Sequence, residues 1–195
     1  MSGISKPTRS VSFHRMQDGT HEDYELLELA ERAYAKSLPD RILGALLKLD
    51  NSLQGYQLSR LAHSLQTATR ALKDGADEEL IVAALIHDVG DDLAPYNHAE
   101  IAAGIIRPYV RAEVSWVVEQ HGLFQSYYYA HHYGGNREAR EKFSGHPWYQ
   151  ACKDFCANWD QCSFDPGYAC EPLSTFEPMV RRIFGRPPHD KRFVG

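Results

Sequence analysis

The amino-acid sequence predicts an all-α fold, a bundle of helices without strands. Apolar residues recur every three or four positions through six or seven segments, and no segment alternates apolar and polar residues as a strand would. Glycine, proline or capping residues stand at the ends of these segments. The chain has 195 residues, 43% of them hydrophobic and 24% charged, which suits one domain with flanking segments.

Four helices are predicted in the first half of the chain. Residues 21–38 carry leucines and alanines at helical spacing, and residues 39–49 repeat the pattern from a proline onward. A third helix is expected over 57–75, where the closing glycine favours a C-terminus. Asp77 and the two glutamates after it begin a fourth helix, over 77–88.

Three further helices are predicted in the second half. An Asn-x-x-Glu capping arrangement opens the helix over 96–109, and the helix over 111–122 ends at a glycine. A proline begins the last predicted helix, over residues 147–161. The aromatic residues 124–133 and the glycine pair after them indicate irregular structure.

The two ends of the chain are expected to differ from this helical part. We predict a flexible segment over residues 1–20, a single helical domain over 21–185 and a tail over 186–195. The basic residues near the C-terminus are expected to be a solvated tail: Arg181, Arg182, Arg186, Lys191 and Arg192.

Charge and composition argue against several classes of protein. A net charge of −5 gives no broad cationic face for nucleic acid or for a membrane surface. No apolar run approaches the roughly 18 residues that span a bilayer, and the N-terminal residues lack the apolar core of a signal peptide. The four cysteines lack a Cys-x-x-Cys spacing, so we expect free thiols and a cytoplasmic protein.

The predicted helix over 77–88 ends on two polar residues. Its residues from Leu80 to Ile86 are all apolar, which indicates burial on every side, and His87 and Asp88 follow directly. A buried carboxylate needs a proton, a cation or a metal ion as its partner. A hydrogen bond between His87 and Asp88 would also satisfy both groups.

Four more residues belong to the same pattern. His63 lies opposite the leucine face of its helix, so it faces either water or a polar site. His98 and His121 lie on apolar faces, and Asp160 stands at the buried end of the last helix. Four imidazoles and two carboxylates suit two metal ions that share a bridging carboxylate, with iron, manganese and zinc as candidates.

The order of these residues resembles the H…HD…D signature of the HD-domain superfamily. A histidine comes first, then the adjacent His-Asp pair, then a distal aspartate, and two histidines between the pair and that aspartate mark the dinuclear branch. The resemblance covers residues 56–162. It implies an HD-domain helical bundle with a dinuclear metal site in its core.

Within the superfamily, the sequence resembles the diiron oxygenases more than the phosphohydrolases. Many HD phosphohydrolases carry a lysine shortly after the HD pair, where this chain has Asp91 and Asp92. A doubly acidic edge repels a phosphate ester. The stretch LAHSLQTATRALKDGADEELIVAALIHDVG, residues 61–90, is similar to the mixed-valent diiron oxygenases that cleave carbon–phosphorus bonds.

That resemblance implies a ligand set and a reaction. The ligands of the first iron would be His63, His87, Asp88 and Asp160, with Asp88 as the bridge, and those of the second His98 and His121. The Fe(II)/Fe(III) pair, with O2 as co-substrate, would convert a 1-hydroxyalkylphosphonate to a carboxylic acid and phosphate.

The residues around the implied centre depart from the family. A gating tyrosine and glutamate of one such oxygenase correspond here to Leu53 and Tyr56, and its phosphonate-holding basic residues correspond to Gln125 and Ala157. Asp91 stands where that enzyme has a histidine. The metal ligands are therefore expected to be kept and the substrate-binding residues to be changed.

The tyrosine-rich segment after His121 favours a cationic substrate. Ring faces and carboxylates recognise a trimethylammonium group, which has no N–H to donate. The expected substrate-binding residues are Asp91, Gln125, Tyr56, Tyr127, Tyr129 and Tyr133, with Tyr24 and Glu28 as a further gate. The hypothesis is conversion of (1-hydroxy-2-(trimethylammonio)ethyl)phosphonate and O2 to glycine betaine and phosphate. Tyrosine-rich segments also cover cores or mediate dimerisation, and an oligomer stays open.

Three other functions stay open. The same chemistry on 2-amino-1-hydroxyethylphosphonate would give glycine, a metal-dependent phosphohydrolase would need no O2, and a scaffold or ligand sensor would catalyse nothing. The sequence does not order the basic residues that could hold the phosphonate: Lys153, Arg137, Arg140 and Arg181.

Overall fold

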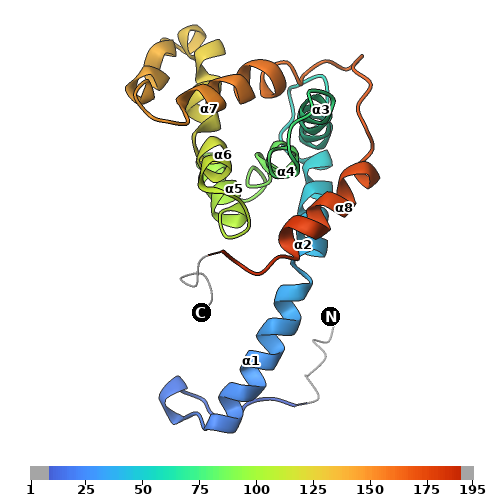
Figure 1. Cartoon of the computed structure of the whole chain (residues 1–195), viewed down its shortest axis with the longest axis vertical. Coiled ribbons are helices and arrows are strands. Elements are labelled where there is room, and N and C mark those ends of the chain that lie inside the picture. Colours follow the sequence, from blue (N-terminus) through green and yellow to red (C-terminus); the bar gives the residue numbers. More distant parts are fainter. Residues whose placement is uncertain (1–8, 190–195) are drawn as a thin grey trace. The chain divides into compact units, whose positions relative to one another are not determined.

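The computed structural model describes residues 9–189, and over that range the chain is helical and contains no strand (Figure 1). The predicted all-α fold class is confirmed. The chain divides into two compact units, Met1–Leu38 and Pro39–Gly195. The predicted boundaries of a single domain, at residues 21 and 185, stay predictions.

The first unit is built around the helix α1 (His21–Lys36), which the 3-10 turn η1 (Met16–Asp18) precedes. Thr20 and Asp23 form a capping box, and Ser12 donates two hydrogen bonds of 2.8 and 2.9 Å to the Asp23 carboxylate. These bonds fix the start of α1. The flexibility of residues 1–20 stays a prediction, and the first eight of them lie outside the described range.

Two residues that the sequence proposes as a gate lie on α1. The Tyr24 hydroxyl donates a hydrogen bond to the backbone carbonyl of Met16, and Glu28 accepts one from Arg32 one helical turn later. Both side chains therefore have partners within the first unit, and their gating role stays a prediction.

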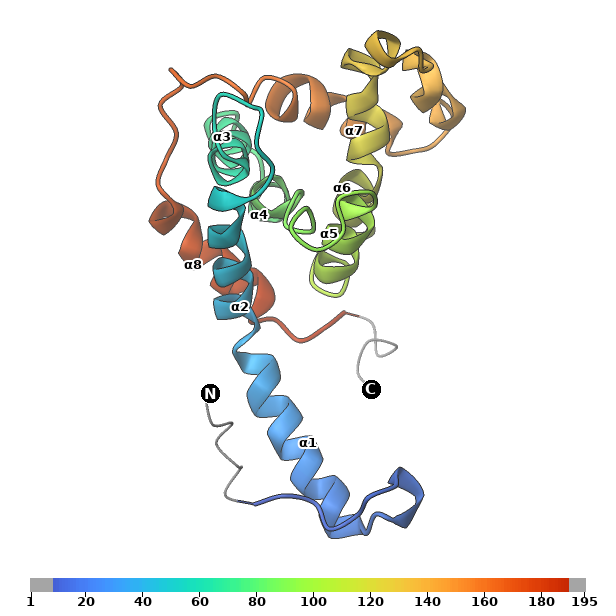
Figure 2. The same cartoon turned by 180° about the vertical axis from the view of Figure 1, so that it is seen from behind.

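The second unit contains the helices α2 to α8. Their bounds are α2 Leu38–Lys48, α3 Arg60–Lys73, α4 Glu78–Ile86, α5 His98–Ile106, α6 Ala112–Gln125, α7 Tyr149–Phe155 and α8 Leu173–Phe184. The shorter turns are η2 Leu49–Asn51, η3 Ser126–Tyr128, η4 Ala130–Tyr133, η5 Arg137–Phe143 and η6 Cys156–Asp160. In both views α4 lies between α3 on one side and α5 and α6 on the other (Figure 1, Figure 2).

Helix α4 forms the centre of the core. Its residues from Val82 to Ile86 are fully buried, and α3, α6 and α8 pack against it. Burial of a large aliphatic side chain such as Leu85 stabilises the fold by about 1.5–3 kcal/mol. The burial on every side that the apolar run predicts is confirmed, and it carries His87 and Asp88 into the interior.

The buried face of α3 is polar rather than apolar. His63, Ser64, Gln66 and Thr67 are buried, whereas the leucines of α3 are only partly buried. Of the two environments open to His63, water or a polar site, the structure shows the polar site. The polar face of α3 therefore turns toward the end of α4.

The last predicted helix changes its winding before Asp160. Residues Tyr149–Phe155 form α7, and Cys156–Asp160 continue as a π-helical turn. Such turns inside helices frequently lie at functional sites, because they redirect the side chains that follow. This turn ends on Asp160, which is 2% exposed.

Helix α8 is absent from the sequence-based prediction, which is wrong in assigning Arg181 and Arg182 to a tail. The inner face of α8 packs on α4. Its buried residues are Phe176, Val180, Ile183 and Phe184. Arg186, just beyond α8, pairs with Glu79 at 2.6 Å, because the burial of α8 brings it to the start of α4. The two basic residues after position 189 lie outside the described residues.

Candidate metal centre

Four imidazoles in the second unit share one hydrogen-bonding pattern. Each places its Nδ1 atom against a backbone carbonyl oxygen: His63 on Ser163 at 2.9 Å, His87 on Ala84 at 2.8 Å, His98 on Pro95 at 3.2 Å and His121 on Val118 at 2.6 Å. A carbonyl oxygen only accepts, so Nδ1 carries a proton, and in the neutral imidazole Nε2 keeps a lone pair. This arrangement orients a histidine to bind a metal ion through Nε2.

The four Nε2 atoms meet in two pairs. The Nε2 atoms of His63 and His87 are 3.1 Å apart, and those of His98 and His121 are 3.3 Å apart. Two lone pairs at such a distance need a proton or a cation between them. Each pair therefore marks a place where an ion fits.

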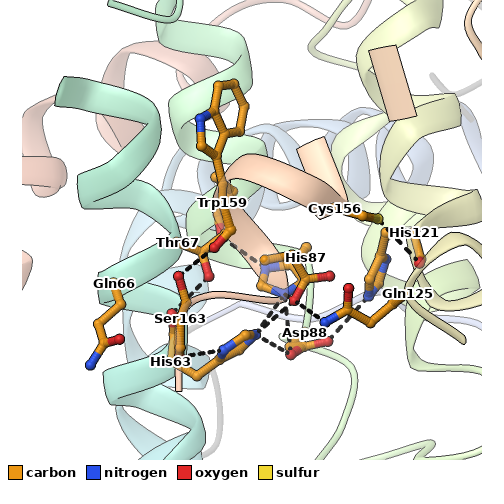
Figure 3. Close-up of polar contacts among 12 residues, drawn as sticks. His63, Gln66, Thr67, His87, Asp88, His121, Gln125, Cys156, Trp159 and Ser163 are labelled. Atoms are coloured by element: carbon orange, nitrogen blue, oxygen red, sulfur yellow. Dashed lines mark hydrogen bonds and ion pairs between the residues drawn. The ribbon is translucent and has the colours of Figure 1, made fainter. Parts of the chain in front are cut away.

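The Asp88 carboxylate faces both pairs. Its Oδ2 atom lies 3.3 Å from His63 Nε2 and 3.2 Å from His87 Nε2. Its Oδ1 atom lies 3.3 Å from the Nε2 atoms of both His98 and His121. Figure 3 shows His63, His87 and His121 converging on Asp88. One oxygen turned to each pair is the arrangement that a bridging carboxylate needs.

Asp160 completes the first pair. Its Oδ1 atom lies 3.3 Å from His63 Nε2 and 3.7 Å from His87 Nε2, and it accepts a hydrogen bond of 3.2 Å from the Gln125 amide. The other oxygen, Oδ2, is buried and has no hydrogen-bond partner among the described residues. A buried unpaired carboxylate oxygen is costly, and a cation would satisfy it.

These side chains form three overlapping groups that could hold metal. The groups are His63, His87 and Asp160; His87, Asp88 and His121; and Asp88, Asp91 and His98, with the candidate ligand atoms of each within 4.8 Å of one another. The structure thus brings together all six residues that the sequence proposes as ligands. Their donors are nitrogen and oxygen, which fits iron, manganese or zinc.

The charges of the centre suit cations. Burial alone would raise the pKa of Asp88, but the neighbouring His87 and Arg60 and several hydrogen bonds hold it well below its usual range. Burial alone would raise the pKa of Asp160, but the hydrogen bond with His63 and the charges of His87, His63 and His121 together lower it. Burial lowers the pKa of His63, yet hydrogen bonds with Asp160 and Asp88 raise it to about 9. An incoming ion must therefore displace a proton.

Arg60 is a member of the centre that the sequence analysis missed. It is 8% exposed, and its guanidinium lies 2.5 Å from Asp88 Oδ2 and 2.7 Å from Asp91 Oδ2. Because Arg60 precedes His63 by three positions on α3, both lie on one helix face, and that spacing was the available signal. Asp91 also contacts His98 Nδ1 at 3.1 Å. Its carboxylate is engaged by Arg60 and His98.

A stack of rings leads from the surface to the first pair. The rings of Tyr56 and Phe164 stack at 4.9 Å, and Phe164 stacks on His63 at 4.3 Å. Tyr56 is 51% exposed, so the stack reaches solvent. Phe164 is not among the site residues predicted from the sequence, although it directly follows Ser163, whose carbonyl holds His63.

The tyrosines after α6 have diverse partners. The guanidinium carbons of Arg140 and Arg137 lie 3.6 and 4.2 Å from the centre of the Tyr127 ring. Tyr129 and Tyr133 contact each other edge to face at 6.3 Å. Burial raises the pKa of Tyr129, and the charges of Tyr56 and Asp160 add to the shift. The Asp160 charge therefore acts on the Tyr129 hydroxyl, whereas the Tyr127 ring already lies against two guanidinium groups.

Two basic residues proposed for the phosphonate lie in other environments. Arg181 pairs with Asp40 at 2.8 Å and with Glu177 at 2.7 Å. Lys153 lies 5.9 Å from the centre of the Tyr149 ring. A role of either in binding phosphonate stays a prediction.

The family model described as HD domain matches residues 60–149. That range includes five of the six proposed ligands and ends before Asp160. HD domains bind divalent metals and belong to metal-dependent enzymes, usually hydrolases. No curated protein sequence matches the chain. Over the described residues, none of the helices has both the length and the apolar character needed to cross a bilayer.

Proposed function

With residues 60–149 forming an HD domain, we propose that the protein is a diiron oxygenase that cleaves the carbon–phosphorus bond of a 1-hydroxyalkylphosphonate. The preferred substrate is (1-hydroxy-2-(trimethylammonio)ethyl)phosphonate. With O2 it gives glycine betaine and phosphate, so that O2 accepts the electrons released at the hydroxyl-bearing carbon. The protein acts as a cytoplasmic enzyme on this small molecule.

One observation supports the two-ion centre above others. Asp88 turns one carboxylate oxygen to each of two imidazole pairs. A single ion would leave one pair of Nε2 lone pairs facing each other without a partner. Four imidazoles also suit iron better than the hard ion Mg2+, which prefers oxygen ligands. When bound, a mixed-valent iron pair would supply the redox chemistry with O2.

The protein's own residues would hold the centre and exclude water from it. His63, His87 and His121 are at most 2% exposed, and the backbone carbonyls fix the direction of their rings. The Gln125 amide holds Asp160 in place. Fixed ligands keep the geometry of a metal site, and a dry surrounding strengthens its electrostatics.

Three rings, those of Phe164, Tyr56 and Tyr129, are suited to the trimethylammonium group. Phe164 packs on a ligand histidine and Tyr56 packs on Phe164, while burial and the charges of Tyr56 and Asp160 raise the pKa of Tyr129. Each ring face contributes about 0.5–2 kcal/mol to binding a cation. We assign the ammonium to these three rings rather than to Tyr127, whose ring already lies against two guanidinium groups.

Turnover tests the proposal directly. The iron-loaded protein is incubated with the trimethylammonium hydroxyphosphonate in air, and betaine, phosphate and O2 consumption are measured. We expect all three in equal amounts, and we expect none without O2. Side-by-side reaction of 2-amino-1-hydroxyethylphosphonate measures the preference for the quaternary amine. Absence of both betaine and phosphate would refute the assigned reaction.

One observation favours a second candidate, a metal-dependent phosphohydrolase. Arg60 pairs with Asp91, which removes much of the repulsion that an acidic edge exerts on a phosphate ester. HD domains also occur mostly in hydrolases. Release of phosphate from phosphate esters in the absence of O2 would identify this activity.

A further inference from the structure

We infer that Arg60 is a positioning residue that ties the two halves of the metal centre together. It holds the bridging carboxylate Asp88 directly and holds His98 through Asp91. This inference rests on the two-ion centre of the proposed function and is independent of the substrate and of O2.

Arg60 contacts two carboxylates. Its Nη2 atom lies 2.5 Å from Asp88 Oδ2 and 2.7 Å from Asp91 Oδ2, and its Nε atom donates to the same Asp91 oxygen at 2.7 Å. All three side chains are at most 10% exposed. A planar guanidinium can address two carboxylates at once, and an ammonium cannot reproduce that fork.

Asp91 in turn contacts His98. The Asp91 oxygen that is free of Arg60, Oδ1, lies 3.1 Å from His98 Nδ1. The Pro95 carbonyl oxygen lies 3.2 Å from the same Nδ1 atom, so Asp91 and this carbonyl share its N–H. A carboxylate against Nδ1 orients a metal-binding histidine and increases its basicity. His98 is 23% exposed at its side chain, the most exposed of the four imidazoles, so packing restrains it least.

The backbone at Gly90 brings Asp91 close to His98. Gly90 lies against the start of α5: a Cβ atom there would come within 2.6 Å of the His98 carbonyl oxygen and 2.9 Å of its Cα atom. The turn after the His-Asp pair can approach α5 this closely because position 90 has no side chain. Arg60, Asp88, Asp91 and His98 therefore form a closed circuit of contacts, with His98 Nε2 returning to Asp88 Oδ1 at 3.3 Å.

The circuit predicts an asymmetric effect on the two ions. Arg60→Gln keeps a side chain that can hydrogen-bond but removes the charge and the fork. We expect the ion at His98 and His121 to bind about 10- to 100-fold more weakly, the range typical for partners that orient ligands. Arg60 is also a cation 2.5 Å from Asp88 Oδ2, the oxygen that faces His63 and His87, so its removal lowers the repulsion of an ion at that pair. Because backbone carbonyls and Gln125 still hold His63, His87 and Asp160, we expect the affinity of the first ion to stay unchanged or to rise.

The test uses anaerobic titration of the metal-free full chain with Mn(II) and Fe(II), in the absence of any phosphonate. Stoichiometry and the two affinities are measured for Arg60→Gln, Arg60→Lys, Asp91→Asn and the double variant Arg60→Gln/Asp91→Asn. Asp91→Asn should weaken the same ion, and the double variant should be no worse than Arg60→Gln alone because both act through His98. Arg60→Lys should recover only part of the affinity. Arg186→Gln, which removes an arginine–carboxylate pair at the opposite end of α4, serves as the matched control.

Several outcomes would overturn the inference. They are an equal loss of both ions in Arg60→Gln, unchanged or tighter binding of the second ion, and full recovery by lysine. If Arg60→Gln does not fold, Arg60→Lys and Asp91→Asn decide by the same criterion of selective loss. A wild-type protein that binds two ions but oxidises no hydroxyphosphonate contradicts the proposed function and leaves this inference standing.

Discussion

The metal centre and the tyrosine-rich segment 124–133 differ in what fixes their side chains. At the centre, each imidazole has a backbone carbonyl on one nitrogen and points the other toward Asp88. In the segment, Tyr127 is stacked by arginines of η5, while Tyr129 and Tyr133 are 46% and 85% exposed. The buried side chains of the centre have one fixed arrangement, which indicates the chemistry of the site. The exposed rings of the segment would determine substrate specificity only after a bound ligand orders them.

This difference indicates which residues can be substituted without loss of the metal centre. Gln125 of segment 124–133 holds the ligand Asp160, but none of the described bonds to the imidazole Nδ1 atoms comes from a tyrosine of that segment. Substitutions among the tyrosines should therefore alter substrate choice and spare the ions.

Loss of the bridge should have the largest effect. Asp88→Asn removes the charge that both imidazole pairs share, so we expect the protein to retain almost none of its two ions. The variant also leaves Arg60 partly unpaired, at a cost of about 3–5 kcal/mol in the free energy of unfolding. Elemental analysis after dialysis measures the ions, and thermal unfolding checks the fold. Asp154→Asn, an exposed carboxylate on α7, is the control, and two ions retained in Asp88→Asn would contradict the bridge.

Loss of one partly exposed ligand should remove one ion. His98→Ala takes a donor from the second pair and leaves His63, His87 and Asp160 complete. We expect the metal content to fall from two ions to one per chain, with little change in thermal stability because the side chain is 23% exposed. His146→Ala, which removes a ring stacked on Trp116 at 4.1 Å, should keep both ions. Loss of both ions in His98→Ala would mean that the pairs are not separate sites.

Metal affinity should depend on pH. The pKa of His63 is raised from 6.5 to about 9 in the metal-free centre, so a binding ion displaces a proton at neutral pH. We expect the apparent affinity to fall about tenfold per pH unit below pH 9. In the metal-free protein, protonated His63 stabilises the fold. This contribution to the free energy of unfolding is fully present below pH 6.5 and is lost as the pH rises through about 9. Titrations at several pH values measure the first effect, and an affinity independent of pH would contradict it.

The smallest effect should fall on substrate choice. Phe164→Leu removes the ring between Tyr56 and His63, and we expect KM for the trimethylammonium substrate to rise about 2- to 30-fold, as 0.5–2 kcal/mol implies. The primary amine should be affected less, since a cation–ring contact matters most to a group without N–H donors. Tyr127→Leu should matter less than Phe164→Leu. A larger effect of Tyr127→Leu would mean that the ammonium group binds at Tyr127 and not at Phe164.

The ligand set could be predicted from the sequence because local rules position it. The apolar run of α4 has to be buried, so the His87-Asp88 pair at its end is carried inside whatever the rest of the fold does. His121 shares a face with valines that are buried. Each of these inferences requires only the residue pattern of a single helix.

Partners brought from other helices could not be predicted in this way. The spacing places Arg60 on the same helix face as His63, but only the packing of α3 on the end of α4 brings it to Asp88 and Asp91. For the same reason Asp91 reads as a free carboxylate for a cation. Helix α8 is a different failure, since Pro178 and the arginines after it obscure an apolar stripe at helical spacing.

Electron paramagnetic resonance of the iron-loaded, partly oxidised protein tests the central claim most directly, because it reports whether two ions share Asp88. We predict the signal of a magnetically coupled Fe(II)/Fe(III) pair, changed by addition of the trimethylammonium hydroxyphosphonate and absent from Asp88→Asn. A spectrum of isolated ferric ions alone, unaffected by the phosphonate and unchanged in Asp88→Asn, would contradict the bridged centre.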